Sequence, residues 1–122
     1  MKIVIADGLP ASAIETLKQP EWNIDNRQAR SAAELTADLK DADALVVRSA
    51  TKVTREVIEA APKLRVVARA GTGVDNVDVA AATARGIVVM NAPGANSVSV
   101  AELAMGLILS MARHIPAADA SM

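Results

Sequence analysis

A glycine-containing loop after an apolar run is the part of the chain whose residue types and spacing could do chemistry. The run covers residues 64–68, and the loop after it carries Gly71 and Gly73, with Arg69 just before them. Glycine leaves room for a ligand against the main chain, and arginine adds a fixed positive charge. We expect the loop to open a helix, so that unpaired N–H groups and the positive end of the helix dipole face the ligand. The pattern predicts an anion-binding site.

The loop does not carry a dinucleotide-binding fingerprint. The G-x-G-x-x-G pattern needs a third glycine for close packing of helix on strand, and Asn76 stands at that position. No acidic residue at the end of a second strand follows at the expected distance. We therefore reject a Rossmann-type cofactor site at Gly71 and Gly73.

Composition limits the classes of function that the chain can serve. Its 122 residues fit one domain with a core of its own. Trp22 is the only aromatic residue, so stacking platforms for single-stranded nucleic acid or a flavin are not expected. A net charge of −1 offers no basic field for nucleic acid or membrane. The absence of cysteine excludes disulfides and thiolate chemistry, and one histidine without clustered ligands predicts no metal site.

The chain carries no pattern that predicts secretion or a membrane span. A strand-like run follows Lys2 directly, where a secretory signal would have a longer apolar region. The most apolar stretch, residues 103–111, is too short to cross a bilayer. We expect a cytoplasmic protein.

Apolar runs and helical patterns alternate along the chain and must position the loop. Strands are predicted at Lys2–Ala6, Trp22–Asp25, Ala44–Val47, Leu64–Ala68 and Ile87–Met90, with a helical pattern after each. This order is typical of an α/β fold with a doubly wound five-stranded parallel sheet, and we predict the flavodoxin-like strand order 2-1-3-4-5. Ligands of such sheets bind beyond the carboxyl ends of the strands. We expect the site among the loops that follow Ala6, Val47, Ala68 and Met90.

Capping signals predict where several helices begin and end. Ser31 and Glu34 have the capping-box spacing, and so do Ser99 and Glu102. Thr54 can cap a third helix, and Gly86 is expected just past the end of a fourth. The last helix, residues 97–113, is apolar nearly all round, which predicts burial on more than one side: one against its own sheet, the other against another domain or a second copy.

Three stretches taken together resemble one family. They are Val46–Lys52 (VVRSATK), Arg69–Asp78 (RAGTGVDNVD) and Asn91–Glu102 (NAPGANSVSVAE). Their order and spacing resemble the N-terminal part of the NAD-dependent D-2-hydroxyacid dehydrogenases, in the branch that oxidises 3-phosphoglycerate. The resemblance implies a two-lobed oxidoreductase that transfers hydride from 3-phosphoglycerate to NAD, the first step of serine biosynthesis. It also implies that this chain is the flavodoxin-like substrate lobe.

The resemblance also implies a role for individual residues. Arg48, Ser49 and Arg69, with Ala70 and Gly71, would bind the carboxylate and phosphate of the substrate. Thr72 would touch the nicotinamide end of NAD. The alternative is that both arginines cap strand ends and pair with nearby carboxylates. The remaining candidates are read as solvated or structural; they are Lys52, Asp75, Asp78, Asn96, Glu102 and His114.

The resemblance divides the chain and indicates what else the enzyme needs. Residues 1–96 would form the substrate-lobe core, 97–113 a helix that contacts another domain or a second copy, and 114–122 a truncated link toward a nucleotide-binding domain. The arginine, glutamate and histidine that are catalytic in the family have no counterpart here. We therefore expect the chain to be inactive alone and to bind NAD only weakly.

The expected partners are a small phosphorylated hydroxy acid, the nucleotide-binding domain and a possible second copy, with no nucleic acid and no membrane. The alternative function is a stand-alone flavodoxin-like binding or assembly module without enzymatic activity.

Overall fold

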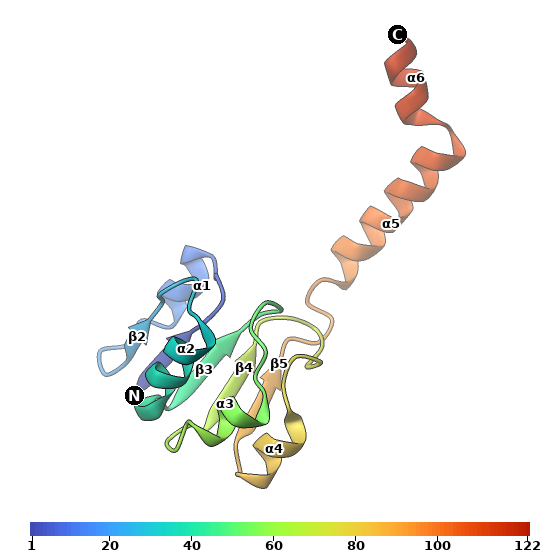
Figure 1. Ribbon diagram of the computed structural model, residues 1–122. Helices are drawn as coiled ribbons and strands as arrows, with labels where there is room; N and C mark the ends of the chain where they lie inside the picture. The colour runs from blue at the N-terminus through green and yellow to red at the C-terminus, as the bar shows by residue number, and fades with distance from the viewer.

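The computed structural model describes residues 1–122, the whole chain, and contains one parallel sheet. Its order is β2-β1-β3-β4-β5, and every neighbouring pair is parallel (Figure 1). The strands are β1 (Lys2–Ile5), β2 (Asn23–Asp25), β3 (Ala44–Val47), β4 (Val66–Arg69) and β5 (Val88–Asn91). The predicted α/β fold class and the strand order 2-1-3-4-5 are confirmed.

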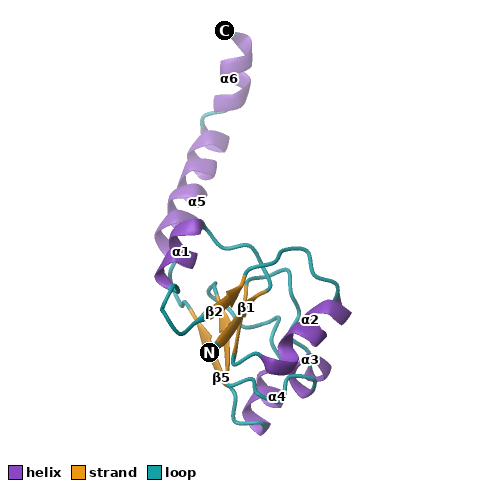
Figure 2. Ribbon diagram, turned by 90° about the vertical axis from the view of Figure 1, so that its left-hand side faces the viewer, coloured by secondary structure: helices purple, strands orange, loops and turns teal.

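The helices lie unequally on the two faces of the sheet. They are α1 (Ala11–Thr16), α2 (Ala32–Asp38), the 3-10 turn η1 (Leu39–Asp41), α3 (Arg55–Glu59), α4 (Val79–Ala84), α5 (Ser97–Ala112) and α6 (Ile115–Ser121). Figure 2 shows α2, α3 and α4 together on one face and α1 on the other. The main core lies under the three helices, where Val4, Leu45 and Val67 are fully buried. Alternate positions such as Ile5 turn to the face that α1 covers.

The predicted packing of the last helix on its own sheet is wrong. No side chain of α5 is buried, and the helix extends away from the sheet (Figure 1). The sheet face near it stays open, so Val88 and Met90 of β5 are 55% and 54% exposed. Before α5 the chain turns through Gly94, whose φ of +71° glycine adopts without strain. This turn directs α5 off the carboxyl edge of the sheet, so the apolar helix and the apolar strand face do not meet.

Residues 114–122, expected as a link, contain the short helix α6. His114 lies between α5 and α6 with a left-handed φ of 52°. No single helix has both the length and the apolar character to cross a membrane. The α5 and α6 pair reaches that length and composition together, but it bends by 58° at the break.

Helix ends follow the capping signals in part. The Ser31 hydroxyl accepts a bond from the Glu34 N–H, and the Glu34 carboxylate accepts one from the Ser31 N–H at 2.8 Å, so this capping box is confirmed. The box at Ser99 is wrong, because α5 begins at Ser97 and Ser99 lies within the helix. Thr54 precedes α3 without a side-chain cap to the backbone. Gly86 follows α4 with φ +67°, as expected.

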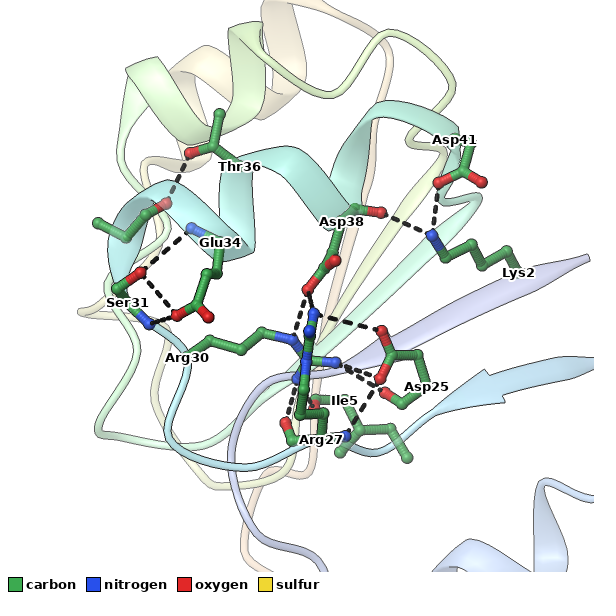
Figure 3. Close-up of polar contacts among 11 residues, drawn as sticks. Lys2, Ile5, Asp25, Arg27, Arg30, Ser31, Glu34, Thr36, Asp38 and Asp41 are labelled. Carbon is green, nitrogen blue, oxygen red and sulfur yellow. Dashed lines mark hydrogen bonds and ion pairs between the residues drawn. The ribbon is translucent and has the colours of Figure 1, made fainter.

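A buried arginine joins β1, β2 and α2 (Figure 3). The Arg30 side chain is 2% exposed and pairs with Asp25 at 2.5 Å and with Asp38 at 2.8 Å. It also donates to the Ile5 carbonyl at 2.7 Å. Arg27 pairs with Asp38 from the solvent side. The network therefore fixes the segment between β2 and α2 against the end of β1, at the edge where ligands of such folds bind.

The same arginines hold the pKa of both carboxyl groups below the ordinary range. For Asp38 the hydrogen bond from Arg27 is the main cause, and burial opposes it only in part. For Asp25 burial alone would raise the pKa, but the bonds from the Arg30 side chain and the Arg27 N–H outweigh it. Because the folded state favours the ionised form, these groups stabilise the fold above their unfolded pKa of about 4. That stabilisation is lost as pH falls through the lower folded values.

We predict that the free energy of unfolding, measured by urea denaturation, falls as the pH is lowered from about 5 to about 2. Part of this fall should disappear in an Asp38→Asn variant. The variant carries no proton-binding group at this position, so its unfolding no longer takes up that proton. An Asp119→Asn variant, in exposed α6, is the matched control and should keep the wild-type acid sensitivity. Equal acid sensitivity of wild type and Asp38→Asn would contradict the prediction.

Candidate functional site

The loop after β3 carries an arginine without an anionic partner. Arg48 is exposed, and its only side-chain hydrogen bond is a long one, at 3.3 Å, to the Gly8 carbonyl. No carboxylate lies within ion-pair distance of its guanidinium. The expected alternative, in which Arg48 pairs with a nearby acid, is therefore not what the structure forms.

The last residue of β4, Arg69, is a second arginine of the same kind. The Arg69 side chain folds over Gly71, because a Cβ added there would lie 2.8 Å from the Arg69 Cζ. Its Nε is buried without a hydrogen-bond partner, and it forms no ion pair. Gly71 is thus required for the position of a guanidinium as well as for access to the main chain. The positive charge of Arg69 remains available to a ligand.

The expected helix dipole at the glycine loop is not there. Turns follow Gly73, Val77 forms an isolated bridge with Val53, and α4 begins only at Val79. The start of α4 is capped by Asp78, whose carboxylate accepts from the Ala81 N–H at 2.8 Å. The positive charge at this site therefore comes from arginine side chains and loop N–H groups, and the dipole of a six-residue helix contributes nothing to it.

A third loop is tied to the glycine loop by hydrogen bonds. The Asn91 side chain donates to the Thr72 carbonyl at 2.6 Å, and the Ala92 N–H donates to the Gly71 carbonyl at 2.9 Å. The Thr72 hydroxyl donates to the Asn96 side chain at 2.9 Å. Asn96 is the residue immediately before α5, so the loop that leads into this helix forms one wall of the site.

These three loops enclose a pocket of about 460 Å³. Its lining is Arg48, Ser49, Arg69, Ala70, Gly71, Thr72, Ala92, Ala95 and Asn96, which includes every residue that the sequence assigned to substrate or cofactor. The N–H groups of Ser49 and Thr72 make no hydrogen bond within the chain and are free to donate. Two guanidinium groups and two free N–H groups suit a small ligand with two oxyanions. The lining has no acidic, histidine, lysine or cysteine side chain, so it can bind and orient but cannot take up a proton at neutral pH.

Two further pockets flank this one. A pocket of about 460 Å³ lies between Asp7, Gln28 and the Arg48 loop, and one of about 650 Å³ lies between the Lys52–Glu56 and Asp75–Asp78 segments. Ser49 lines all three pockets. The remaining sequence candidates stand outside the central pocket; they are Lys52, Asp75, Asp78, Glu102 and His114.

The sequence assigned no role at the site to two residues that shape it. Asp7 lies in the loop after the first strand, which the sequence places at the site without a role for this residue, and Asn76 entered only as the missing third glycine. In the structure Asp7 accepts bonds from the Arg48 N–H at 2.6 Å and from the Thr51 hydroxyl at 2.6 Å. Asn76 donates to the carbonyls of the same two residues at 2.7 and 2.6 Å. The signal for Asp7 was an acidic residue at the end of a strand. Its hydrogen-bond partners lie more than forty positions away in the chain, so the sequence pattern did not reveal them.

Known proteins resemble the chain over nearly its full length. Residues 3–118 match the family model described as D-isomer specific 2-hydroxyacid dehydrogenase, catalytic domain. The chain is 54% identical to D-3-phosphoglycerate dehydrogenase of Sus scrofa over 121 residues, which are 99% of this chain and 23% of that protein. It is also 54% identical to D-3-phosphoglycerate dehydrogenase of Methanocaldococcus jannaschii over 122 residues, which are 100% of this chain and 23% of that protein. The chain thus spans 23% of the length of these relatives.

Solved structures share the fold. The NAD+-bound 3-phosphoglycerate dehydrogenase of Entamoeba histolytica superposes with a TM-score of 0.79 at 34% identity, over 90% of this chain and 38% of that one. The TT0316 protein of Thermus thermophilus superposes with a TM-score of 0.88 at 30% identity, over 98% of this chain and 39% of that one.

We predict that Gly71→Ala weakens anion binding without weakening the fold. The added Cβ meets only the far end of the Arg69 side chain, which can swing away, so the free energy of unfolding should change by less than about 0.5 kcal/mol. Because the guanidinium then leaves the pocket, affinity for inorganic phosphate in an NMR titration should fall several-fold. Gly106→Ala is the matched control, since nothing lies within 4 Å of its added Cβ. Unchanged phosphate affinity in Gly71→Ala would contradict the assignment of Arg69 to the pocket.

Proposed function

This chain belongs to the D-isomer specific 2-hydroxyacid dehydrogenase family, and we propose that it forms the substrate-binding lobe of a D-3-phosphoglycerate dehydrogenase. The proposed reaction removes a hydride and the hydroxyl proton from 3-phosphoglycerate to give 3-phosphohydroxypyruvate, with the hydride going to NAD. The two relatives at 54% identity are D-3-phosphoglycerate dehydrogenases, which supports this substrate.

The single observation that carries the proposal is the pair of arginines without carboxylate partners in one pocket. Arg48 and Arg69 reach it from neighbouring strands, β3 and β4, whose ends are paired at Val47 and Arg69. An unpaired guanidinium is suited to a phosphate or a carboxylate, and 3-phosphoglycerate carries one of each. We propose that the two guanidinium groups and the N–H groups of Ser49 and Thr72 bind these oxyanions, with Ala70 and Gly71 leaving the main chain open to the substrate.

The residues of this pocket fit one half of a reaction centre. When bound, NAD would be the hydride acceptor. No residue of the pocket lining can take up the hydroxyl proton. We therefore propose that the base and the main cofactor site come from a nucleotide-binding domain that faces this pocket. Thr72 lies at the wall shared with Asn96 and would meet the nicotinamide end of NAD. The chain alone would bind and orient the substrate without oxidising it.

The exposed apolar helix supports a contact with another domain. Leu103, Leu107 and Ile108 of α5 are each more than half exposed, which is costly for large apolar side chains in water. We propose that α5 packs against the nucleotide-binding domain, or against a second copy of the chain. The alternative function is a stand-alone binding or assembly module, and the complete sheet with its own core favours it.

We predict that 3-phosphoglycerate binds the isolated chain and shifts the amide signals of Arg48, Ser49 and residues 69–72 in an NMR titration. Arg48→Ala and Arg69→Ala should each weaken binding by about tenfold, since each removes a charge-assisted contact. Arg55→Ala, an exposed arginine on α3, is the charge-matched control and should bind as the wild type does. Glycerate, which lacks the phosphate, should bind more weakly than 3-phosphoglycerate. Absence of any shift at these residues would favour the stand-alone module.

We also predict that the chain produces no NADH when it is incubated with NAD and 3-phosphoglycerate, as followed by the absorbance of the reduced nicotinamide. The pocket lining holds no group that could take up the hydroxyl proton. Sustained NADH formation would show that the chain contains a complete reaction centre and would contradict the proposed division of labour.

A further inference from the structure

Asp7 is the only buried acidic residue of the chain. It is 9% exposed and lies directly beyond β1. No arginine, lysine or histidine pairs with it. Its Oδ2 accepts from the Arg48 N–H at 2.6 Å and the Thr51 N–H at 3.2 Å, and its Oδ1 accepts from the Thr51 hydroxyl at 2.6 Å. A buried carboxylate is thus satisfied almost entirely by one loop, residues 48–51.

Asn76 binds the same loop at the loop's backbone carbonyl groups. Its Nδ2 donates to the Arg48 carbonyl at 2.7 Å and to the Thr51 carbonyl at 2.6 Å. Asp7 takes the N–H groups of Arg48 and Thr51, and Asn76 takes the carbonyls of the same two residues. Both ends of the loop are therefore fixed, from β1 on one side and from the glycine loop on the other.

Ser49, which lies between these fixed ends, and Arg48, which is one of them, both line the central pocket. Ser49 lines the central pocket, and its N–H makes no bond within the chain. Arg48 lines this pocket and also the flanking one, where its guanidinium donates to the Gly8 carbonyl at 3.3 Å, and no carboxylate pairs with it. A loop of this length would otherwise sample several conformations, and each would place the Ser49 N–H and the Arg48 guanidinium differently.

We propose that Asp7 and Asn76 are positioning residues that hold the Arg48–Thr51 loop in the one conformation that directs Arg48 and the Ser49 N–H at the substrate oxyanion. The proposal deepens the proposed function, since the oxyanion is that of the substrate. Asp7 does not itself line the central pocket, and hydrogen bonds from the loop occupy both of its oxygens, so it is not a proton acceptor for the reaction.

Burial by itself would raise the pKa of Asp7, but the bonds from the Thr51 hydroxyl and the loop N–H groups hold that pKa below its ordinary value. Asp7 therefore stays ionised at neutral pH and keeps its full capacity to accept.

Two substitutions at Asp7 separate positioning from charge. Asp7→Ala removes every acceptor, whereas Asp7→Asn can still accept both N–H groups at one oxygen and donate to the Thr51 hydroxyl. Both remove the same negative charge, so electrostatics alone predicts that both tighten anion binding by a similar factor. Positioning predicts the opposite for Asp7→Ala: about tenfold weaker binding of 3-phosphoglycerate, while Asp7→Asn stays within about threefold of wild type.

Hydrogen exchange tests the loop without any ligand. The N–H groups of Arg48 and Thr51 should exchange at least about tenfold faster in Asp7→Ala than in wild type, while the N–H of Val67 in β4 keeps its rate. Asn76→Ala provides a second, less buried variant and should also weaken 3-phosphoglycerate binding. Asp75→Asn is the charge-matched control, because Asp75 is exposed and makes no hydrogen bond or ion pair; its loop exchange and its binding should match wild type.

The outcomes distinguish this proposal from the proposed function. Wild-type exchange rates at Arg48 and Thr51 in Asp7→Ala, or equal and tighter binding in both Asp7 variants, would overturn the positioning role. A wild-type chain that binds no 3-phosphoglycerate would overturn the proposed function instead, and the exchange rates would still decide whether Asp7 and Asn76 hold the loop. Faster loop exchange together with weaker binding in Asp7→Ala and Asn76→Ala supports both.

Discussion

Parallel pairing of β3 with both β1 and β4 brings the carboxyl ends of three strands to one edge of the sheet. The backbone N–H and C=O groups of the loops at this edge no longer pair in the sheet, so they need other hydrogen-bond partners. Asp7 after β1 and Asn76 after β4 do so for the loop after β3. Hydrogen-bond satisfaction at this edge therefore shapes the pocket, and the two arginines occupy positions that this arrangement defines.

The chain contains two kinds of arginine, and the structure separates them by partner. Arg30 and Arg27 are paired with Asp25 and Asp38, so their charges are neutralised within the fold. Arg48 and Arg69 have no carboxylate partner, although Asp7 lies close in the fold to the Arg48 backbone. Asp7 does not neutralise the Arg48 guanidinium because loop N–H and hydroxyl groups occupy its oxygens. The central pocket therefore keeps two unpaired guanidinium groups in a protein whose net charge is −1.

The pocket and the exposed helix are connected through a few polar contacts. Thr72 and Asn96 share a hydrogen bond at the wall of the pocket, and α5 begins at the next residue. The apolar side chains of α5 and the β5 residues Val88 and Met90 remain exposed.

The sequence by itself determined the α/β class, the strand order and the loops among which the pocket lies. Alternation of apolar runs with helical patterns permits few topologies, and Arg48, Ser49 and the 69–72 segment each follow such a run. The tertiary structure alone decided that α5 leaves the sheet and that α4 begins too late to serve the glycine loop. It also decided that Asp7 and Asn76 meet one loop. These features depend on hydrogen bonds between residues that are distant in the chain and on one turn at Gly94. The spacing of residues along a single strand or helix contains no information about such bonds or about that turn.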